Sequence, residues 1–484
     1  MDAHLFTHKV CKLRSLCVSS DISLGVSSGV SLLSPLYRSI YSGSGLLAVV
    51  MGLGLLEGGG AIAKPMSVDA SPIDALDSQL VTRVPAEPQQ IARNVSQSEV
   101  RSIWLDRETI VNARSPEGLA HVFEQFRAAG INTVFVETVN AGYPIYPSDV
   151  APQQNPLTRS WDPLDAAVDL GKVYGIKVHA WVWLFAAGNT EHNHLVGQPA
   201  SYPGPLLSAH PDWAGLDNQG NLVLPGKTKP FLDPANPEVR RYLFDLLDEI
   251  ATRYDVDGIQ FDYVRYPFQD AAANRTFGYG MAARQQFYSL TGVDPATIPS
   301  RNGGDQRIAR LWSQWTDFRA EQINSFVAEA SERLRRRRGD LTISAAVFAD
   351  DTFYRHHAIQ QDWEGWAEQG LVDWIVLMSY AQSTSEFSEL VRPWVMESSF
   401  RYTQVIPGIR LLNLPAAEAA SQIELLRQMP VSGYALFAAD NLNGEVQSML
   451  TAVNEDDVEV ALSSRLSARE KAGLGQEDLR SRRK

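Results

Sequence analysis

Between residues 98 and 453 the chain alternates between two hydrophobic patterns. Short runs of β-branched and aromatic residues are followed by longer stretches in which apolar residues recur at three- and four-residue spacing. Runs of the first kind predict strands, and spacing of the second kind predicts amphipathic helices. Eight strands are expected: Val100–Asp106, Thr133–Val139, Lys177–Trp183, Gly258–Val264, Thr342–Phe348, Trp374–Tyr380, Gln404–Arg410 and Gly433–Ala439.

Helix start and stop signals lie between these runs. Capping residues followed by proline open helices, and glycine closes them. The clearest helices are expected from Ser115-Pro116 to Gly130, from Asp162-Pro163 to Gly175, over Pro237–Tyr254 and over Leu311–Arg338. Eight strand–helix units in about 350 residues predict an α/β fold, the (β/α)8 TIM barrel. A doubly wound open sheet is the alternative, but it usually carries a glycine-rich loop after its first strand, and none follows Asp106.

Two segments without strong periodicity interrupt the alternation. They are Leu184–Asn236, after the third expected strand, and Arg265 to about Ile308, after the fourth. Each follows a strand, so both are expected as long loops on the C-terminal face of the barrel. Barrel enzymes keep their active sites on that face.

The block Asp257–Pro267 contains the strongest candidate for chemistry. Side chains alternate along a strand, so Ile259 and Phe261 are expected to face the helices. Gln260 and Asp262 are then expected to face the barrel axis. A carboxylate there is costly to bury without a use or a partner, which favours Asp262 as a catalytic residue. The alternative is a structural ion pair with Arg265 or another cation.

The same alternation places other acids and aromatic residues on the axial face. Glycoside cleavage requires two carboxyl groups, and aromatic faces suit the C–H faces of sugars. Glu137 is the first choice for the second acid and Asp350 the second choice. Candidate substrate-binding residues are Asn140, His179, Trp181, Trp183, Tyr263, Arg265 and Tyr380. Core packing explains Trp181 equally well, and for His179 a hydrogen-bonded structural role is favoured over proton transfer.

The first 63 residues are typical of a secretory leader. Basic residues precede the apolar run Leu46–Leu56, which is too short to span a bilayer as an ordinary helix, and Ala61-Ile62-Ala63 offers a cleavage site. We therefore expect a signal peptide over residues 1–63 and an exported protein in the periplasm, cell envelope or medium, without a stable membrane span after processing. An uncleaved anchor or a disordered tail is the alternative.

Composition limits the remaining possibilities. Residues 64–97 are expected to form a linker and 454–484 a charged, disordered tail around the barrel of 98–453. The two cysteines, Cys11 and Cys17, lie in the leader, so the mature chain would have no disulfide and no cysteine nucleophile. A net charge of −13 argues against nucleic acid as a partner. The basic run Arg335–Arg338 is expected to complement a helix dipole.

No cofactor or metal is expected. The pairs His192/His194 and His356-His357 match no zinc signature, and histidine pairs in loops are usually solvated. There is also no Walker loop and no G-x-S-x-G nucleophile elbow.

Several blocks resemble the bacterial glycosyl hydrolase-like family 10 proteins. They are Glu99–Leu105, Asn132–Glu137, Tyr146-Pro147-Ser148, His179-Ala180-Trp181, Asp233–Arg240, Asp257–Pro267, Gln361-Asp362-Trp363 and Val372–Ile375. The resemblance covers roughly residues 98–440, and it is most specific in the Asp233 and Asp257 blocks. It implies a barrel with a carbohydrate-active role, some members acting on cell-wall glycans, and it carries the catalytic carboxylate onto Asp262. Many members have two acids after the phenylalanine where this chain has Asp262-Tyr263, and many have glutamine near the position of Glu137.

These observations predict a glycosidase that cleaves an extracytoplasmic polysaccharide with two carboxylates. A non-catalytic glycan-binding barrel and a metal-dependent polysaccharide deacetylase are the alternatives. A carboxylate gap of about 5–10 Å across one cleft would favour hydrolysis, and a His/Asp cluster closing on one point would favour the deacetylase.

Overall fold

The computed structural model describes residues 99–454, except for 271–272, 300–303 and 397–399. All of these residues fall within one compact unit. The predicted signal peptide, the linker and residues 455–484 of the predicted tail lie outside the described residues. In the part of the chain that is described, no helix combines the length and the apolar character needed to cross a membrane.

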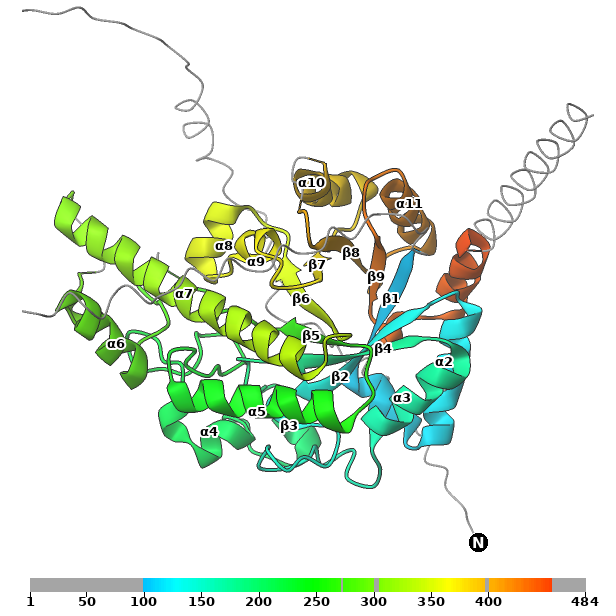
Figure 1. Ribbon diagram of the computed structural model, residues 1–484, viewed down its shortest axis with the longest axis horizontal. Coiled ribbons are helices and arrows are strands. Elements are labelled where there is room, and N and C mark those ends of the chain that lie inside the picture. The colour runs from blue at the N-terminus through cyan, green and yellow to red at the C-terminus, as the bar shows by residue number, and fades with distance from the viewer. Residues whose placement is uncertain (1–98, 271–272, 300–303, 397–399, 455–484) are drawn as a thin grey trace, which may run out of the picture. The chain divides into compact units, whose positions relative to one another are not determined.

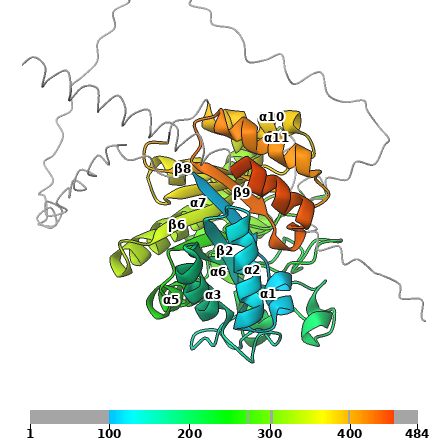
Figure 2. The same ribbon diagram turned by 90° about the vertical axis from the view of Figure 1, so that its right-hand side faces the viewer.

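Eight parallel strands close into a barrel (Figure 1). They are β1 (Val100–Leu105), β2 (Thr133–Asn140), β4 (Lys177–Trp183), β5 (Gly258–Asp262), β6 (Thr342–Phe348), β7 (Trp374–Met378), β8 (Gln404–Arg410) and β9 (Gly433–Phe437). The barrel closes because β1 pairs with both β2 and β9, and Figure 2 shows β1 beside β9. A short ninth strand, β3 (Tyr143–Pro144), pairs antiparallel with β2. The expected eight strands and the (β/α)8 fold are confirmed.

Helices cover the outside of the barrel. They are α1 (Arg107–Ala113), α2 (Pro116–Ala128), α3 (Pro163–Tyr174), α5 (Pro237–Arg253), α7 (Gln306–Arg337), α8 (Thr352–Ala358), α9 (Trp363–Glu368), α10 (Thr384–Val395) and α11 (Ala416–Arg427), and a last described helix covers 444–454. The side chains of Ser115 and Asp162 cap α2 and α3 as expected. Helix α7 begins five residues before the expected Leu311, because Asp305 caps it there.

The basic run at the end of α7 is part of the structural surface. Arg335 pairs with Asp373 at 3.0 Å, Arg337 with Asp248 at 3.3 Å and Arg338 with Asp340 at 2.8 Å. The run therefore neutralises neighbouring acids as well as lying at the C-terminal end of a helix dipole.

Both segments expected as long loops contain helices that the sequence pattern did not predict. The first holds α4 (Pro205–Ala209) and the 3-10 turns η1 (Asn193–Val196) and η2 (Pro211–Trp213), and the second holds α6 (Met281–Thr291) and η3 (Pro295–Thr297). Helix α6 buries only Ala283 and Phe287, whereas Met281 and Leu290 are 66% and 74% exposed. Apolar residues on its exposed side blur the amphipathic pattern by which a helix is found in a sequence.

The expected alternation along β5 is confirmed. Ile259 and Phe261 are fully buried in the layer between the barrel and its helices. Gln260 faces the interior, where its Oε1 accepts a 2.6 Å hydrogen bond from Trp104 Nε1 of β1. The strand ends at Asp262 and not at Val264, because Tyr263 takes a left-handed φ of 49° that breaks the extended backbone.

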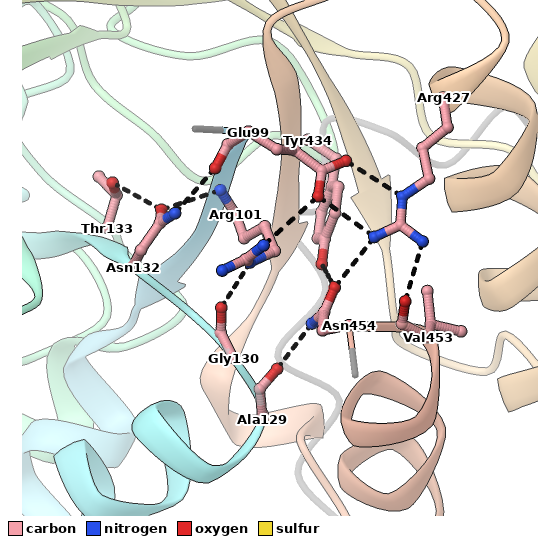
Figure 3. A network of polar contacts seen from close by, with 10 residues as sticks. All are labelled: Glu99, Arg101, Ala129, Gly130, Asn132, Thr133, Arg427, Tyr434, Val453 and Asn454. Carbon is pink, nitrogen blue, oxygen red and sulfur yellow. Dashed lines mark hydrogen bonds and ion pairs between the residues drawn. The ribbon is translucent and has the colours of Figure 1, made fainter. Parts of the chain in front are cut away.

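A polar network ties the first described residues to the last (Figure 3). The Arg427 guanidinium contacts the Glu99 carboxylate at 3.2–3.3 Å and donates to Asn454 Oδ1 at 3.1 Å. Asn454 also accepts from the Tyr434 hydroxyl and donates to the Ala129 carbonyl. This network joins α11, the last described helix and the beginning of β1 at the seam between β1 and β9.

Candidate active site

Two buried acids point into the barrel near its C-terminal end, with a tryptophan between them. Glu137 of β2 pairs in register with Trp181 of β4. The indole Nε1 of Trp181 in turn donates a 2.8 Å hydrogen bond to Asp262 Oδ2 at the end of β5. Glu137 and Asp262 are only 4% and 8% exposed. The barrel therefore brings the first two acids chosen from the sequence to the two sides of one aromatic side chain.

Burial and the polar neighbours of Asp262 have opposite effects on its pKa. Burial raises the pKa of its carboxyl to about 6, since a charged group loses its hydration there. Hydrogen bonds from Trp181 Nε1 and from the Tyr263 backbone N–H, the latter at 2.6 Å, lower the pKa, as do the positive charges of Arg265 and Lys229. Asp262 is thus a carboxylate with donors that stabilise its ionised form.

Glu137 has fewer stabilising neighbours. Its Oε2 accepts a 2.6 Å hydrogen bond from the backbone N–H of Arg107, at the start of α1, and its Oε1 accepts one from Asn140 Nδ2. Burial raises the pKa of Glu137 to about 7; the Arg107 charge and the two donors lower it, and the negative charge of Asp106 adds to the rise. Burial therefore raises the pKa of both acids by a similar amount, and Glu137 keeps the higher value because the usual pKa of a glutamate lies above that of an aspartate.

Arg107 is held in place by a neutral histidine. Arg107 Nη2 and Asn189 Nδ2 both lie 3.1 Å from His192 Nδ1. Both partners are donors, so Nδ1 accepts and the ring proton is on Nε2. Burial and the Arg107 charge lower the pKa of His192 to about 4, which is consistent with a neutral ring.

Aromatic rings form a wall next to Asp262. The rings of Trp183 and Tyr263 lie 4.3 Å apart, and Phe231 lies 6.0 Å from Tyr263. Lys229 Nζ lies 5.9 Å from the Trp183 ring. The Arg265 guanidinium lies 5.1 Å from the Tyr263 ring and donates to the Tyr266 carbonyl at 2.9 Å. The left-handed backbone of Tyr263, unusual for an aromatic residue, is a local strain of the kind that clusters at functional sites.

Tyr380 and His179 are both packed against other aromatic rings. Tyr380 stacks on Phe437 at 5.5 Å, and burial together with the negative charge of Asp262 holds its pKa well above the usual value. His179 is fully buried in the barrel interior, stacked 4.8 Å from Trp374.

The hydrogen bond expected for His179 is not observed. Neither of its ring nitrogens has a hydrogen-bond partner among the described residues, and burial lowers its pKa to about 3. The ring is therefore a neutral packing element of the interior, away from any surface that a substrate could reach.

Asp350 lies farther out than the other two acids. Phe261 pairs in register with Ala345, so the next residue, Asp262, is level with Ala346. Asp350 follows the end of β6 and lies about four residues beyond that level. Burial raises the pKa of Asp350, partly offset by the Arg355 charge. Asp350 is thus at the rim, whereas Glu137 and Asp262 are inside the mouth.

Arg107, Lys229 and Asp233 are site or loop residues that the sequence reasoning did not select. Lys229 is 5% exposed although it lies in the long segment after β4, and nothing in its local sequence distinguishes it from a solvated lysine. Asp233 is 1% exposed and accepts from the Ala235 N–H at 3.0 Å, and burial raises its pKa to about 7. A Cβ on Gly280 would lie 2.2 Å from Asp233 Oδ2, so this acid packs against the first turn of α6. The Asp233 block of the sequence therefore joins the two long segments of the C-terminal face.

Each histidine considered as a metal ligand contacts another group of the protein. His194 contacts the Glu191 carbonyl, His356 pairs with Asp317 at 3.1 Å and His357 contacts the Phe353 carbonyl. Within the described ranges, no three histidine, cysteine or acidic side chains are grouped so that they could hold a metal ion.

Relatives with curated descriptions cover most of the chain. Glycosyl hydrolase DigH of Escherichia coli strain K12 is 26% identical over 419 residues, which span 75% of this chain and 87% of the relative. Glycosyl hydrolase YngK of Bacillus subtilis strain 168 is 21% identical over 395 residues, which span 73% of this chain and 70% of the relative.

Solved structures that share the fold include glycoside hydrolases. The glycoside hydrolase domain of PgaB (BpsB) from Bordetella bronchiseptica aligns with a TM-score of 0.53 at 14% identity and covers 73% of this chain and 98% of that domain. The catalytic domain of a β-amylase from Paenibacillus polymyxa aligns with a TM-score of 0.50 at 11% identity, over 73% of this chain and 96% of that domain. At these identities the likeness concerns the fold alone.

The family model of glycosyl hydrolase-like 10 proteins matches residues 99–421, which include β1 to β8 and nearly all of the helical cover. The chain belongs to the glycosyl hydrolase-like 10 family.

Proposed function

We propose that this protein is a glycoside hydrolase that cleaves an extracytoplasmic polysaccharide, with Glu137 and Asp262 as its two catalytic carboxyl groups. The observation that carries the proposal is the pair of buried acids on either side of Trp181 at the C-terminal end of the barrel. Only β4 separates their strands, so the two backbones lie roughly 10 Å apart. Both side chains point inward, which is compatible with the carboxylate gap of about 5–10 Å that glycosidases use.

Different pKa values suggest different roles. With a pKa of about 7, a large fraction of Glu137 keeps its proton at neutral pH, so Glu137 is the proposed general acid. Asp262, with a pKa of about 6, is mostly ionised there and is the proposed nucleophile or base. Glycoside hydrolysis usually needs one carboxyl group that keeps its proton and one that is ionised.

The proposed substrate is a long glycan, with cell-wall glycan as its first candidate. Trp183 and Tyr263, whose rings lie 4.3 Å apart beside Asp262 and which are each 8% exposed, are the proposed apolar contacts for the sugar at the cleavage site. The leader-like pattern in residues 1–63 supports export to the periplasm, cell envelope or medium. N-terminal sequencing of the protein from fractionated cells is expected to begin at Lys64, and an intact Met1 on a cytoplasmic species would contradict export.

The activity is tested by incubating the mature protein with purified peptidoglycan and a panel of polysaccharides and measuring new reducing ends. Asp262→Asn and Glu137→Gln are expected to lower turnover by several orders of magnitude while glycan binding persists, because positioning contacts survive and bond cleavage does not. Near-normal turnover of Asp262→Asn would end the assignment. Normal turnover of Glu137→Gln alone would move the second role to Asp350. Glycan binding without new reducing ends from the wild type would favour the non-catalytic alternative.

A further inference from the structure

Helix α8 presents exposed aromatic side chains on the rim of the barrel. It follows β6 directly, so it lies on the C-terminal face, and Figure 1 shows it next to α9 and β6. Phe353 is 73% exposed and Tyr354 is 44% exposed. Large aromatic rings gain free energy by leaving water, so two neighbouring exposed rings on a functional face suggest a ligand.

The contacts of α8 determine which way these rings point. The Arg355 side chain is fully buried, with its guanidinium 4.7 Å from the Trp363 ring, and this marks the inner side of the helix. Phe353 and His357 stack on each other at 4.1 Å and project from the opposite side, since each lies two residues from Arg355. His356 contacts Asp317 of α7, so Tyr354 lies on the flank that faces away from α7.

Tyr354 adjoins the rim acid Asp350. Partial burial and the negative charges of Asp350 and Asp351 raise the pKa of the Tyr354 hydroxyl. Asp350 follows Phe348, the last residue of β6, by two positions. The exposed rings of α8 therefore continue directly from the end of β6.

From β6 the contacts lead back to the proposed catalytic centre. The Phe348 ring lies 5.3 Å from the Phe268 ring, and the Arg265 guanidinium lies 5.2 Å from Phe348 and 5.1 Å from Tyr263. The Tyr263 backbone N–H donates to Asp262. Contacts among largely buried aromatic and charged side chains thus connect the proposed nucleophile to the end of β6, which α8 follows in the chain.

We propose that Phe353 and Tyr354 form an outer glycan subsite, on which a distal sugar unit of the polysaccharide stacks while the cleaved linkage lies at Asp262. The inference rests on the proposed function and adds to it a preference for long chains. The C–H faces of sugars pack on flat rings, and the carboxylates of Asp350 and Asp351 can accept hydrogen bonds from sugar hydroxyls. Two rings bordered by acids suit a narrow polar chain, whereas a stable protein interface buries a wider surface with fewer charges at its centre.

The subsite is tested by binding to insoluble peptidoglycan and to insoluble chitin, measured by depletion of protein from solution. The background is full-length mature Asp262→Asn protein, so that the polymer is not consumed. Phe353→Ala combined with Tyr354→Ala is expected to weaken binding to the retained polymer about fivefold to tenfold, the loss typical of removed ring contacts. Phe353→Tyr is expected to retain wild-type affinity, because it keeps the ring.

A matched control is Tyr402→Ala. Tyr402 is 43% exposed, like Tyr354, but it precedes β8 and so belongs to the opposite, N-terminal face of the barrel. Its replacement is expected to leave the dissociation constant unchanged. Equal affinities of the Asp262→Asn protein with and without the two alanine substitutions, for a polymer that the Asp262→Asn protein retains, would overturn the subsite and leave the proposed function intact. A wild type that retains neither polymer and releases no reducing ends from any polysaccharide would overturn both.

Discussion

Trp181→Phe should raise the pKa of Asp262 and narrow the pH range of activity. The substitution keeps an aromatic ring between the two acids but removes the indole N–H that donates to Asp262 Oδ2 at 2.8 Å. A hydrogen bond to a charged group contributes about 1.5–3 kcal/mol, which corresponds to a pKa change of about 1–2 units. This donor stabilises the ionised form, so its loss moves the pKa of Asp262 upward from about 6. The pKa then approaches or passes that of Glu137, about 7.

The assay is kcat/KM against pH on whichever glycan the wild type cleaves. The acidic limb of the profile reports the ionisation of Asp262 in the free enzyme and is expected to move up by about one unit or more. At every pH, a smaller fraction of the enzyme then has Asp262 ionised while Glu137 is protonated. The maximum of kcat/KM should therefore also fall.

Trp104→Phe is the control for this experiment. Trp104 is another buried tryptophan of the barrel interior, and its Nε1 donates at 2.6 Å to Gln260 and not to an acid. It should cost similar stability without moving the acidic limb. An unmoved limb in Trp181→Phe, or equal movement in both variants, would refute the role of this hydrogen bond.

Three further predictions concern stability and are checked by urea unfolding. Phe261→Ala should cost roughly 3–5 kcal/mol because it empties a fully buried site, whereas the nearly isosteric Asp262→Asn should cost little; the reverse order would contradict the inward and outward directions along β5. Asp233 has a folded-state pKa of about 7, above its usual value of 3.8, so it stabilises the fold at low pH and this contribution is lost as pH rises through 7. Asp233→Asn should therefore reduce the stability difference between pH 5 and pH 8 by roughly 2–3 kcal/mol, and an unchanged difference would mean that this carboxyl is not buried in solution. Gly433→Ala should prevent normal closure of β9 on β1, because φ is 146° and the new Cβ would lie 1.9 Å from the Val100 carbonyl oxygen; a stability within 1 kcal/mol of wild type would contradict this packing.

The sequence determined the fold class and the direction of the side chains on the strands. Hydrophobic runs, capping residues and helix-ending glycines are local signals, since each reflects the backbone preference of a few neighbouring residues. They located both ends of all eight barrel strands to within two residues, and strand alternation placed Gln260 inside the barrel and Phe261 outside it. The same parity selected Glu137 and Asp262 without any knowledge of their neighbours.

Only the tertiary structure decided what surrounds these acids. Trp181 joins the two acids because β4 lies between β2 and β5 in the closed barrel. Arg107 begins α1 after β1, and Lys229 lies in the long segment after β4. Nothing in their local sequence marks them as neighbours of a carboxylate. Burial and the charges of distant segments set a pKa, and both depend on the closed barrel. A local pattern can therefore identify an inward-facing acid, but its protonation and its partners are properties of the assembled fold.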